Sequence, residues 1–244
     1  VKGVQKLVAD RDDALTTAVN GFEDKHYKKL AEDLLSLAHQ RRRLLEGGDP
    51  LDVDALLGRG PTTIAGKTRL TVVNTQFLGD PVTTDFWVSQ FLLAVDRWRA
   101  KNPAPDGTLQ AVFLFDEADQ YLPAVGKPAT KGPMESLLRR ARSAGIGIFL
   151  ATQSPGDFDY KCRDQVLTWL VGRVQQPVAI NKLKPMFEAA RADVTGKLPG
   201  QTAGQFFLVR ESGVVPIQAD RNLIPTAQLS EDRVLAAAPR DPGH

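Results

Sequence analysis

Near its middle the chain reads Ala111-Val112-Phe113-Leu114-Phe115-Asp116-Glu117-Ala118-Asp119. Five apolar residues in succession are typical of a strand buried on both faces, as in parallel sheets covered by helices. The run ends in two adjacent carboxylates, which folding alone does not require. In open α/β sheets the carboxyl ends of the strands form the rim where ligands bind. The stretch therefore predicts an α/β fold with an acidic pair at a ligand-binding rim.

This acidic pair has the chemistry of a nucleotide hydrolase. An acid in the position of Asp116 can hold Mg²⁺, as the acidic residue of the Walker B motif does in P-loop NTPases. The adjacent Glu117 can accept a proton from an attacking water. The plainer alternative is a solvated strand end with a helix-capping acid, but the apolar strand before it favours catalysis. Asp119 fits a neighbouring loop acid better than a ligand.

Composition narrows the class of protein. The 244 residues suffice for one large α/β domain or two small ones, and a net charge of +2 gives no argument for nucleic acid or a membrane surface. The single Cys162 excludes an intramolecular disulfide and fits a reducing cytoplasm. No apolar run approaches the ~20 residues of a membrane span. We expect a cytoplasmic protein and, since the chain begins in mid-pattern without methionine, a fragment of a longer one.

Three regions are predicted along the chain. Residues 1–60 form a helical subdomain with a long helix over Phe22–Glu46, followed by a linker rich in Gly, Pro and Asp. Residues 61–225 form the α/β core, and residues 226–244 a flexible tail. The long helix carries one apolar stripe at helical spacing: Tyr27, Leu30, Ala31, Leu34, Leu35 and Ala38.

Strands and helices alternate through the core, which predicts a parallel sheet with right-handed crossovers. The expected strands are Leu70–Asn74, Leu109–Phe115, Ile146–Thr152 and Trp169–Val174. Helices are expected after Asp80-Pro81, over Pro133–Ala144 and over Ile180–Ala190. Phe206–Val209 and Val214–Ile217 flank a short polar turn and predict a terminal antiparallel hairpin.

A nucleotide site also needs a phosphate loop, usually G-x-x-x-x-G-K-[ST] between a strand and a helix. The nearest match ends in Gly66-Lys67-Thr68, but Pro61 stands in place of its first glycine. The segment also precedes a predicted strand, whereas a phosphate loop needs a following helix whose N–H groups bind the anion. We interpret the match as fortuitous, so the phosphate loop lies upstream of residue 1 or has been lost.

Other polar residues accompany the acidic pair. Gln153 follows an equally apolar strand, where a glutamine can contact a terminal phosphate or orient the attacking water; alone it could equally be a turn residue before Pro155. Arg142 lies at the edge of the apolar stripe of the helix after the acidic strand. There it could act as an arginine finger in a neighbouring subunit, although a solvated basic face is nearly as good an explanation. Candidate phosphate-contacting arginines are Arg139, Arg140 and Arg173.

The order of these motifs resembles the C-terminal two-thirds of the ATPase domain in the HerA/FtsK superfamily, which includes HerA-like helicases and the ATPases of conjugative secretion. The resemblance covers about Thr63 to Arg221, and the order of the pieces is more specific than any one of them. The matching pieces are Leu70–Leu78, Phe113–Ala118, Leu138–Gly147, Ala151–Pro155, Val171–Val174 and Leu198–Phe206.

The resemblance implies a RecA-like core: a mostly parallel sheet flanked by helices, with an N-terminal helical insertion and a C-terminal antiparallel hairpin. It implies ATP and Mg²⁺ as cofactors, a ring of subunits, often six, and movement along DNA, with an accessory nuclease or other protein as a possible partner. The same resemblance implies a role for each candidate residue. Asp116 is the acid on the Mg²⁺ side of the site, Glu117 the catalytic base, Gln153 the residue that senses the terminal phosphate, and Arg142 the arginine finger.

The sequence departs from the family in lacking the phosphate loop, so these residues alone should not bind ATP properly. A degenerate, non-catalytic scaffold module is therefore the alternative to a DNA-translocating motor. An ABC-type ATPase is a third class, but no Leu-Ser-Gly-Gly-Gln-like sequence precedes Asp116.

Overall fold

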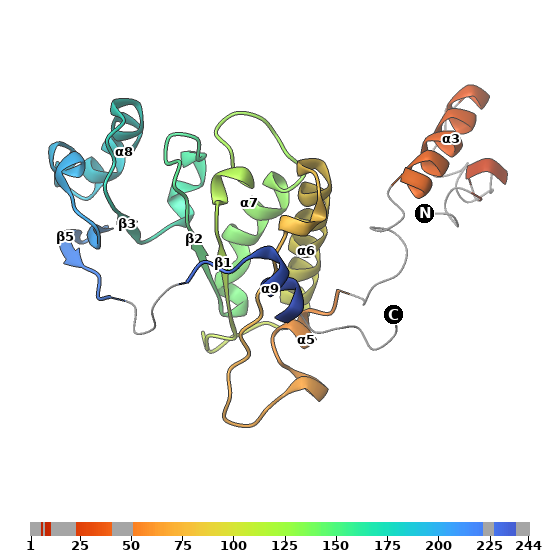
Figure 1. The fold of residues 1–244 in the computed structure, drawn as a ribbon, viewed down its shortest axis with the longest axis horizontal. Coiled ribbons are helices and arrows are strands. Elements are labelled where there is room, and N and C mark those ends of the chain that lie inside the picture. The colour runs from red at the N-terminus through yellow and green to blue at the C-terminus, as the bar shows by residue number, and fades with distance from the viewer. Residues whose placement is uncertain (1–5, 7, 11–22, 41–50, 222–226, 238–244) are drawn as a thin grey trace. The chain divides into compact units, whose positions relative to one another are not determined.

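The computed structural model describes residues 6, 8–10, 23–40, 51–221 and 227–237. The chain divides into two compact units, and each is described here by itself. The first contains Val1–Gln153 and Asp157–Asp159, and the second contains Ser154–Gly156 and Tyr160–His244. Strands and helices both occur in the two units, as the predicted α/β class requires (Figure 1).

A parallel pair of strands forms the centre of the first unit (Figure 1). Strand β1 (Ala111–Phe115) pairs with β2 (Ile146–Leu150) in the register Ala111 to Ile146 and Phe115 to Leu150. The sequence predicts both strands and their parallel pairing. Between them the chain runs through the 3₁₀ turn η3 (Ala118–Gln120), helix α7 (Lys131–Arg140) and the 3₁₀ turn η4 (Ala141–Ala144).

Helix α6 (Pro81–Lys101) packs beside this pair. It begins as predicted, with Pro81 in the first turn and Asp80 as the N-cap whose side chain accepts a hydrogen bond from the Thr83 N–H. Phe91 of α6 meets Phe113 of β1 edge-on, with ring centroids 5.8 Å apart. Leu92 of α6 and Met134 and Leu137 of α7 are fully buried, so both helices contribute to the core of this unit.

The sheet is not buried on both faces, which corrects the expectation from the sequence. Leu114 is 67% exposed and Phe149, its partner across the ladder, is 58% exposed. Side chains alternate across a strand, so these two residues lie on one face while Phe113 faces α6. Within the described residues, helices therefore cover only one face of this two-stranded sheet. The apolar run of β1 gives the strand apolar side chains on both faces, but only one of these faces is buried.

The predicted strand over Leu70–Asn74 is also wrong. These residues have no ladder partner in the described part of the chain, and Leu70 is 86% exposed. The Thr71 hydroxyl instead donates a hydrogen bond to the Leu56 carbonyl, 2.6 Å away, in the short helix α5 (Val53–Leu56). A strand forms only when a neighbour accepts its backbone hydrogen bonds, and an apolar, β-branched sequence does not supply that neighbour.

The predicted N-terminal helix is present as α3 (Asp24–Gln40), and residues 41–46 lie outside the described residues. Its buried side chains are Tyr27, Ala31 and Ala38, and the first two pack with Val8. Leu30 and Leu35, which the sequence places in the same stripe, are exposed. The apolar face of α3 is therefore narrower than predicted, and its role as an insertion stays a prediction.

The second unit has its own sheet and core. Strands β3 (Trp169–Val171), β4 (Gln205–Arg210) and β5 (Gly213–Gln218) form an antiparallel sheet in the order β3-β4-β5. Helix α8 (Pro177–Ala189) and the 3₁₀ turn η6 (Thr195–Gly200) connect β3 to β4. Leu183, Phe187, Leu198, Phe207 and Val209 lie in the core cluster of this unit.

Two predictions about this unit have different outcomes. The β4–β5 hairpin is confirmed, with Arg210 opposite Gly213 across the turn. The mostly parallel sheet is not, because β3 pairs antiparallel with β4 and the parallel sheet of the described residues has two strands. The unit also includes the 3₁₀ turn η5 (Tyr160–Gln165) and helix α9 (Glu231–Ala237).

Gly145 sets the entry into β2, and replacing it tests this role. Its φ is +58°, and a Cβ built there would lie 1.9 Å from the Thr108 carbonyl oxygen. We expect Gly145→Ala to lower the free energy of unfolding by about 3 kcal/mol, because left-handed strain and a backbone clash add together. Gly132→Ala is the control: a Cβ there meets nothing within 4 Å, and alanine should stabilise helix α7 by up to about 1 kcal/mol. Equal urea-unfolding midpoints for the two variants would contradict this account.

Candidate active site at the strand ends

The ladder between β1 and β2 continues past both strands. The Ala151 N–H donates to the Phe115 carbonyl at 2.9 Å, and the Ala118 N–H donates to the Ala151 carbonyl at 2.8 Å. These two bonds hold the segments that follow the strands at the same edge of the sheet. The residues at that edge are the ones that the sequence singles out as a ligand-binding rim.

Glu117 and Gln153 meet at this edge. The Gln153 Nε2 donates a hydrogen bond to Glu117 Oε1 at a distance of 3.0 Å. Asp116 is exposed, and its Oδ1 accepts a hydrogen bond from the Glu117 N–H at 3.0 Å. The structure therefore brings together Asp116, Glu117 and Gln153, although they are separated by up to 37 positions in the sequence (153 − 116).

Glu117 has a strained backbone. Its φ of 51° and ψ of 45° lie in the left-handed region, which costs a residue other than glycine roughly 1–2 kcal/mol. Non-glycine residues are held there when their surroundings impose it, and such positions cluster at functional sites. Here the chain leaves β1 and turns at once into η3, and the turn aims the Glu117 carboxylate toward Gln153.

A second side-chain bond joins the two strand ends. The Thr152 hydroxyl donates a short hydrogen bond to Asp119 Oδ1. Asp119 follows β1 and Thr152 follows β2, so this bond, like the Glu117–Gln153 bond, joins the segments that follow the two strands. Asp119 thus links the two strand ends through its carboxylate, and its interpretation as a loop acid rather than a ligand stays a prediction.

Tyr121 and Asp85 also belong to this site, and the sequence analysis missed both. Burial raises the pKa of the Tyr121 hydroxyl, and the carboxylates of Asp85, Asp116 and Glu117 raise it further, while a hydrogen bond with Thr75 opposes the rise. Burial also raises the pKa of Asp85, which lies on α6. Tyr121 therefore presents a protonated hydroxyl beside the acidic pair at neutral pH.

The loop after Tyr121 is held by a buried ion pair. Lys131 Nζ lies 2.7 Å from Asp159 Oδ2, and the two side chains are 14% and 7% exposed. The same ammonium group donates to the Pro123 carbonyl at 2.7 Å. The Thr130 hydroxyl, fully buried, donates to the Tyr121 carbonyl at 3.3 Å. These contacts fix the backbone of the segment that carries Tyr121.

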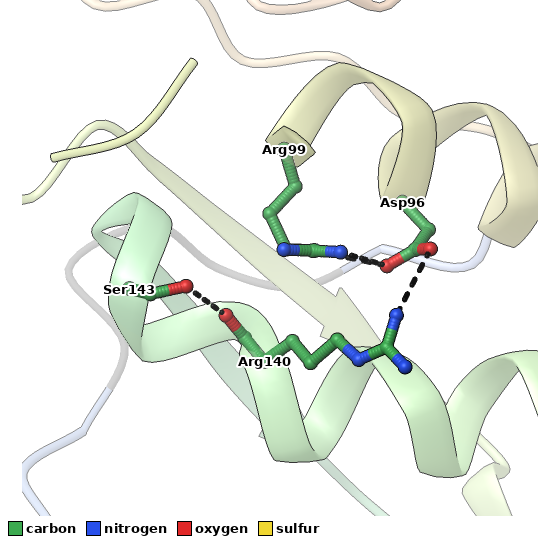
Figure 2. Close-up of polar contacts among 4 residues, drawn as sticks. All are labelled: Asp96, Arg99, Arg140 and Ser143. Carbon is green, nitrogen blue, oxygen red and sulfur yellow. Dashed lines mark hydrogen bonds and ion pairs between the residues drawn. The ribbon is translucent and has the colours of Figure 1, made fainter. Parts of the chain in front are cut away.

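The arginines differ in their surroundings. Arg140 Nη1 lies 3.9 Å from Asp96 Oδ2 on α6, and Asp96 Oδ1 also accepts a hydrogen bond from Arg99 Nε (Figure 2). Arg140 is therefore engaged in a contact between α7 and α6. Arg139 is exposed on the last turn of α7. Arg173 is exposed and follows β3 in the second unit.

Arg142 does not lie on the helix that the sequence predicts over Pro133–Ala144. Helix α7 ends at Arg140, and Arg142 is exposed on the 3₁₀ turn η4. The helical angle that places it at the edge of the buried stripe therefore does not apply. The roles assigned to these four arginines stay predictions.

Few side chains at this site could coordinate a metal ion. Within the described residues no group of three or more His, Cys, Asp or Glu side chains could hold a metal ion. An exposed Asp116 with one oxygen bonded to the Glu117 N–H still suits Mg²⁺, which keeps several waters and needs one or two carboxylates beside substrate phosphates. Gly66, Lys67 and Thr68 are exposed, and no helix follows them directly, as the sequence predicts.

A family model for the C-terminal region of HerA-like helicases matches residues 2–185, about three-quarters of the chain. The chain belongs to this HerA-like family. No curated protein matches it. Among the helices of the described residues, none has the length and apolar content to cross a membrane.

Among solved structures, this HerA-like chain is similar to the genome-packaging NTPase B204 from Sulfolobus turreted icosahedral virus 2. In its complex with AMPPCP the identity is 17%, the match covers 72% of this chain and 73% of that one, and the TM-score is 0.49. VirB4 of Thermoanaerobacter pseudethanolicus is 14% identical over 81% of this chain and 54% of that one, with a TM-score of 0.49. The bacterial conjugative coupling protein TrwBΔN70 is 11% identical over 60% and 38%, with a TM-score of 0.42.

The strain at Glu117 can be measured with two variants that both remove its carboxylate. Glu117→Gly and Glu117→Ala lose the same bond to Gln153, but only glycine adopts the left-handed region at little cost. We expect Glu117→Gly to be more stable than Glu117→Ala by about 1 kcal/mol in urea unfolding. An alanine variant as stable as the glycine variant would mean that the backbone at this position relaxes.

Proposed function

We propose that this chain is the catalytic part of a HerA-like motor that hydrolyses ATP. The observation that carries the proposal is the hydrogen bond between Gln153 and Glu117, which places a carboxylate and an amide side by side at the carboxyl ends of two parallel strands. The match to the HerA-like helicase family supports the same function.

Three side chains divide the chemistry. Glu117 accepts the proton of the attacking water, and Gln153 holds the carboxylate in place and orients that water. Asp116 would hold Mg²⁺, whose charge neutralises the phosphate oxygens. Tyr121, protonated and buried beside them, adds no charge to the site.

The remaining parts of the motor are proposals of the same kind. Arg142, on the exposed turn η4, reaches the site of the next subunit in a ring, and Arg139, Arg140 and Arg173 contact phosphate. DNA is the substrate on which the ring moves, with an accessory nuclease or another protein as its partner, in the cytoplasm. The sequence has no G-x-x-x-x-G-K-[ST] motif, so a segment outside these 244 residues supplies the phosphate cradle.

The missing phosphate loop also supports a second candidate, a non-catalytic scaffold that keeps the ATPase fold. The two functions differ in what Glu117 does. In a scaffold the Glu117–Gln153 contact would serve stability alone. A conservative replacement of Glu117 would then leave the rate of ATP hydrolysis unchanged.

Glu117→Gln in the full-length protein separates the two. Glutamine keeps the shape and the Oε1 acceptor for Gln153 but cannot take a proton, so we expect kcat for ATP to fall by about 10²–10⁴ with nucleotide binding retained. Steady-state hydrolysis and equilibrium binding of ATP measure the two effects. The matched control is Glu135→Gln on α7, a half-buried residue outside the site. Undiminished hydrolysis by Glu117→Gln would remove Glu117 as the base.

Mixed rings test whether Arg142 acts on a neighbour. Arg142→Ala subunits keep the base, and Glu117→Gln subunits keep the arginine, so an interface between one of each has a complete site. We expect kcat to fall by about 10³-fold or more in Arg142→Ala alone and by about 10²–10⁴ in Glu117→Gln alone. Their mixture should recover part of the activity. Mixing Arg97→Ala, an exposed arginine on α6, with Glu117→Gln controls for simple dilution. A mixture as inactive as its components would exclude action in trans.

A further inference from the structure

The second unit contains a pocket that the strand-end site does not use. Its volume is about 450 Å³, and it lies between the turn η6 and the strands β4 and β5. This volume suits a small organic ligand. Its principal lining residues are Lys197, Gln201, Gln205, Phe206, Ile217 and Gln218.

Gln201 is the unusual member of this set. It is 93% buried (7% exposed), and its Oε1 has no hydrogen-bond partner. In the part of the chain that the structure describes, no other buried side-chain nitrogen or oxygen lacks a partner. Buried polar groups are hydrogen-bonded as a rule, so an orphaned acceptor next to a pocket is a place where a ligand can donate.

The two other glutamines are occupied. Gln205 Oε1 accepts a hydrogen bond from the Thr202 N–H at 2.9 Å, and Gln218 Nε2 donates to the Ala219 carbonyl at 3.3 Å. Gln218 is further fixed above Gly204, where a Cβ would lie 2.5 Å from its Nε2. These two bonds hold the backbone around the pocket, and Gln201 Oε1 is the buried acceptor of the lining that has no partner.

The walls favour a flat ligand with an anionic end. Phe206 packs its ring against Gly172, where a Cβ would lie 3.1 Å from the ring carbon Cε1, so the ring is held in place. Ile217 adds apolar surface, and Lys197 adds an exposed cation. Nucleotides combine a flat base, which stacks on aromatic rings and has polar edges, with an anionic phosphate.

We propose that this pocket binds a nucleobase whose exocyclic amino group donates to Gln201 Oε1. Glutamine is a common partner of the adenine amino edge, which makes adenine the best match. The base comes from a free nucleotide or from a single strand of nucleic acid, since both offer the same edge and a phosphate for Lys197. The inference does not rest on the proposed ATPase function, because it uses no residue of the strand-end site.

The test compares two ligands that differ only in the amino group. Adenosine 5′-monophosphate carries it, and purine riboside 5′-monophosphate lacks it. By calorimetry with the full chain we expect the first to bind about tenfold more tightly to the unaltered protein. Gln201→Met, which keeps the shape and removes the acceptor, should bind both equally. Equal affinities for the unaltered protein, the same ratio in Gln201→Met, or no binding at millimolar concentration would each overturn the proposal.

Two further measurements separate binding from folding and from hydrolysis. Because Gln201 Oε1 has no partner to lose, Gln201→Met should keep or raise the melting temperature, whereas Gln205→Met loses the Thr202 N–H bond and should lower it. A lower melting temperature for Gln201→Met would mean a structural role and would overturn the proposal. Glu117→Gln should leave the tenfold ratio unchanged, so failure here is distinct from failure of the ATPase assignment.

The source of the base is decided with a single-stranded oligodeoxyadenylate. Tighter binding of the oligonucleotide than of the mononucleotide, with the same loss in Gln201→Met, identifies a nucleic-acid strand. Equal binding of the two identifies a free nucleotide. The control Gln90→Met, an exposed glutamine on α6, should change neither affinity.

Discussion

The candidate active site depends on the parallel pairing of β1 and β2. Its geometry comes from the backbone ladder, which continues past both strands through the Ala151–Phe115 and Ala118–Ala151 bonds. A slip of one residue in this ladder would move Gln153 by about 3.3 Å along the strand, enough to break a hydrogen bond whose donor and acceptor must stay within about 3.2 Å. It would also turn every side chain of the strand to the opposite face.

The register of that ladder is set at the opposite end of β2. Gly145 approaches the Thr108 carbonyl so closely that no side chain fits, and its own carbonyl accepts a hydrogen bond from the Gln110 N–H at 2.7 Å. Gln110 in turn is bonded by Arg59, whose guanidinium also lies over the Trp98 ring of α6. The geometry at Glu117 is thus tied, through the strands, to contacts at the far end of the sheet.

Some of this could be predicted from the sequence and some could not. The pairing of two apolar strands and the meeting of Glu117 with Gln153 follow from general rules for parallel sheets, which need only local patterns. The strand expected at Leu70–Asn74 would need a neighbouring strand to pair with, and the local sequence pattern does not reveal whether such a neighbour exists. Tyr121 and Asp85 join the site through interactions between distant segments, which local patterns do not show. Helical spacing also did not predict that α7 ends at Arg140.

Glu117 and Gln201 each break a general rule of protein structure, Glu117 through its backbone and Gln201 through its side chain. Glu117 occupies a backbone region that favours glycine. Gln201 buries a side-chain oxygen that has no hydrogen-bond partner, a cost that a hydrophobic residue would avoid. Natural sequences agree with their folds at most positions, and the exceptions are concentrated where function requires them. The two exceptions lie in different units. On the proposals made above, one unit holds a carboxylate for proton transfer and the other an amide oxygen for ligand recognition.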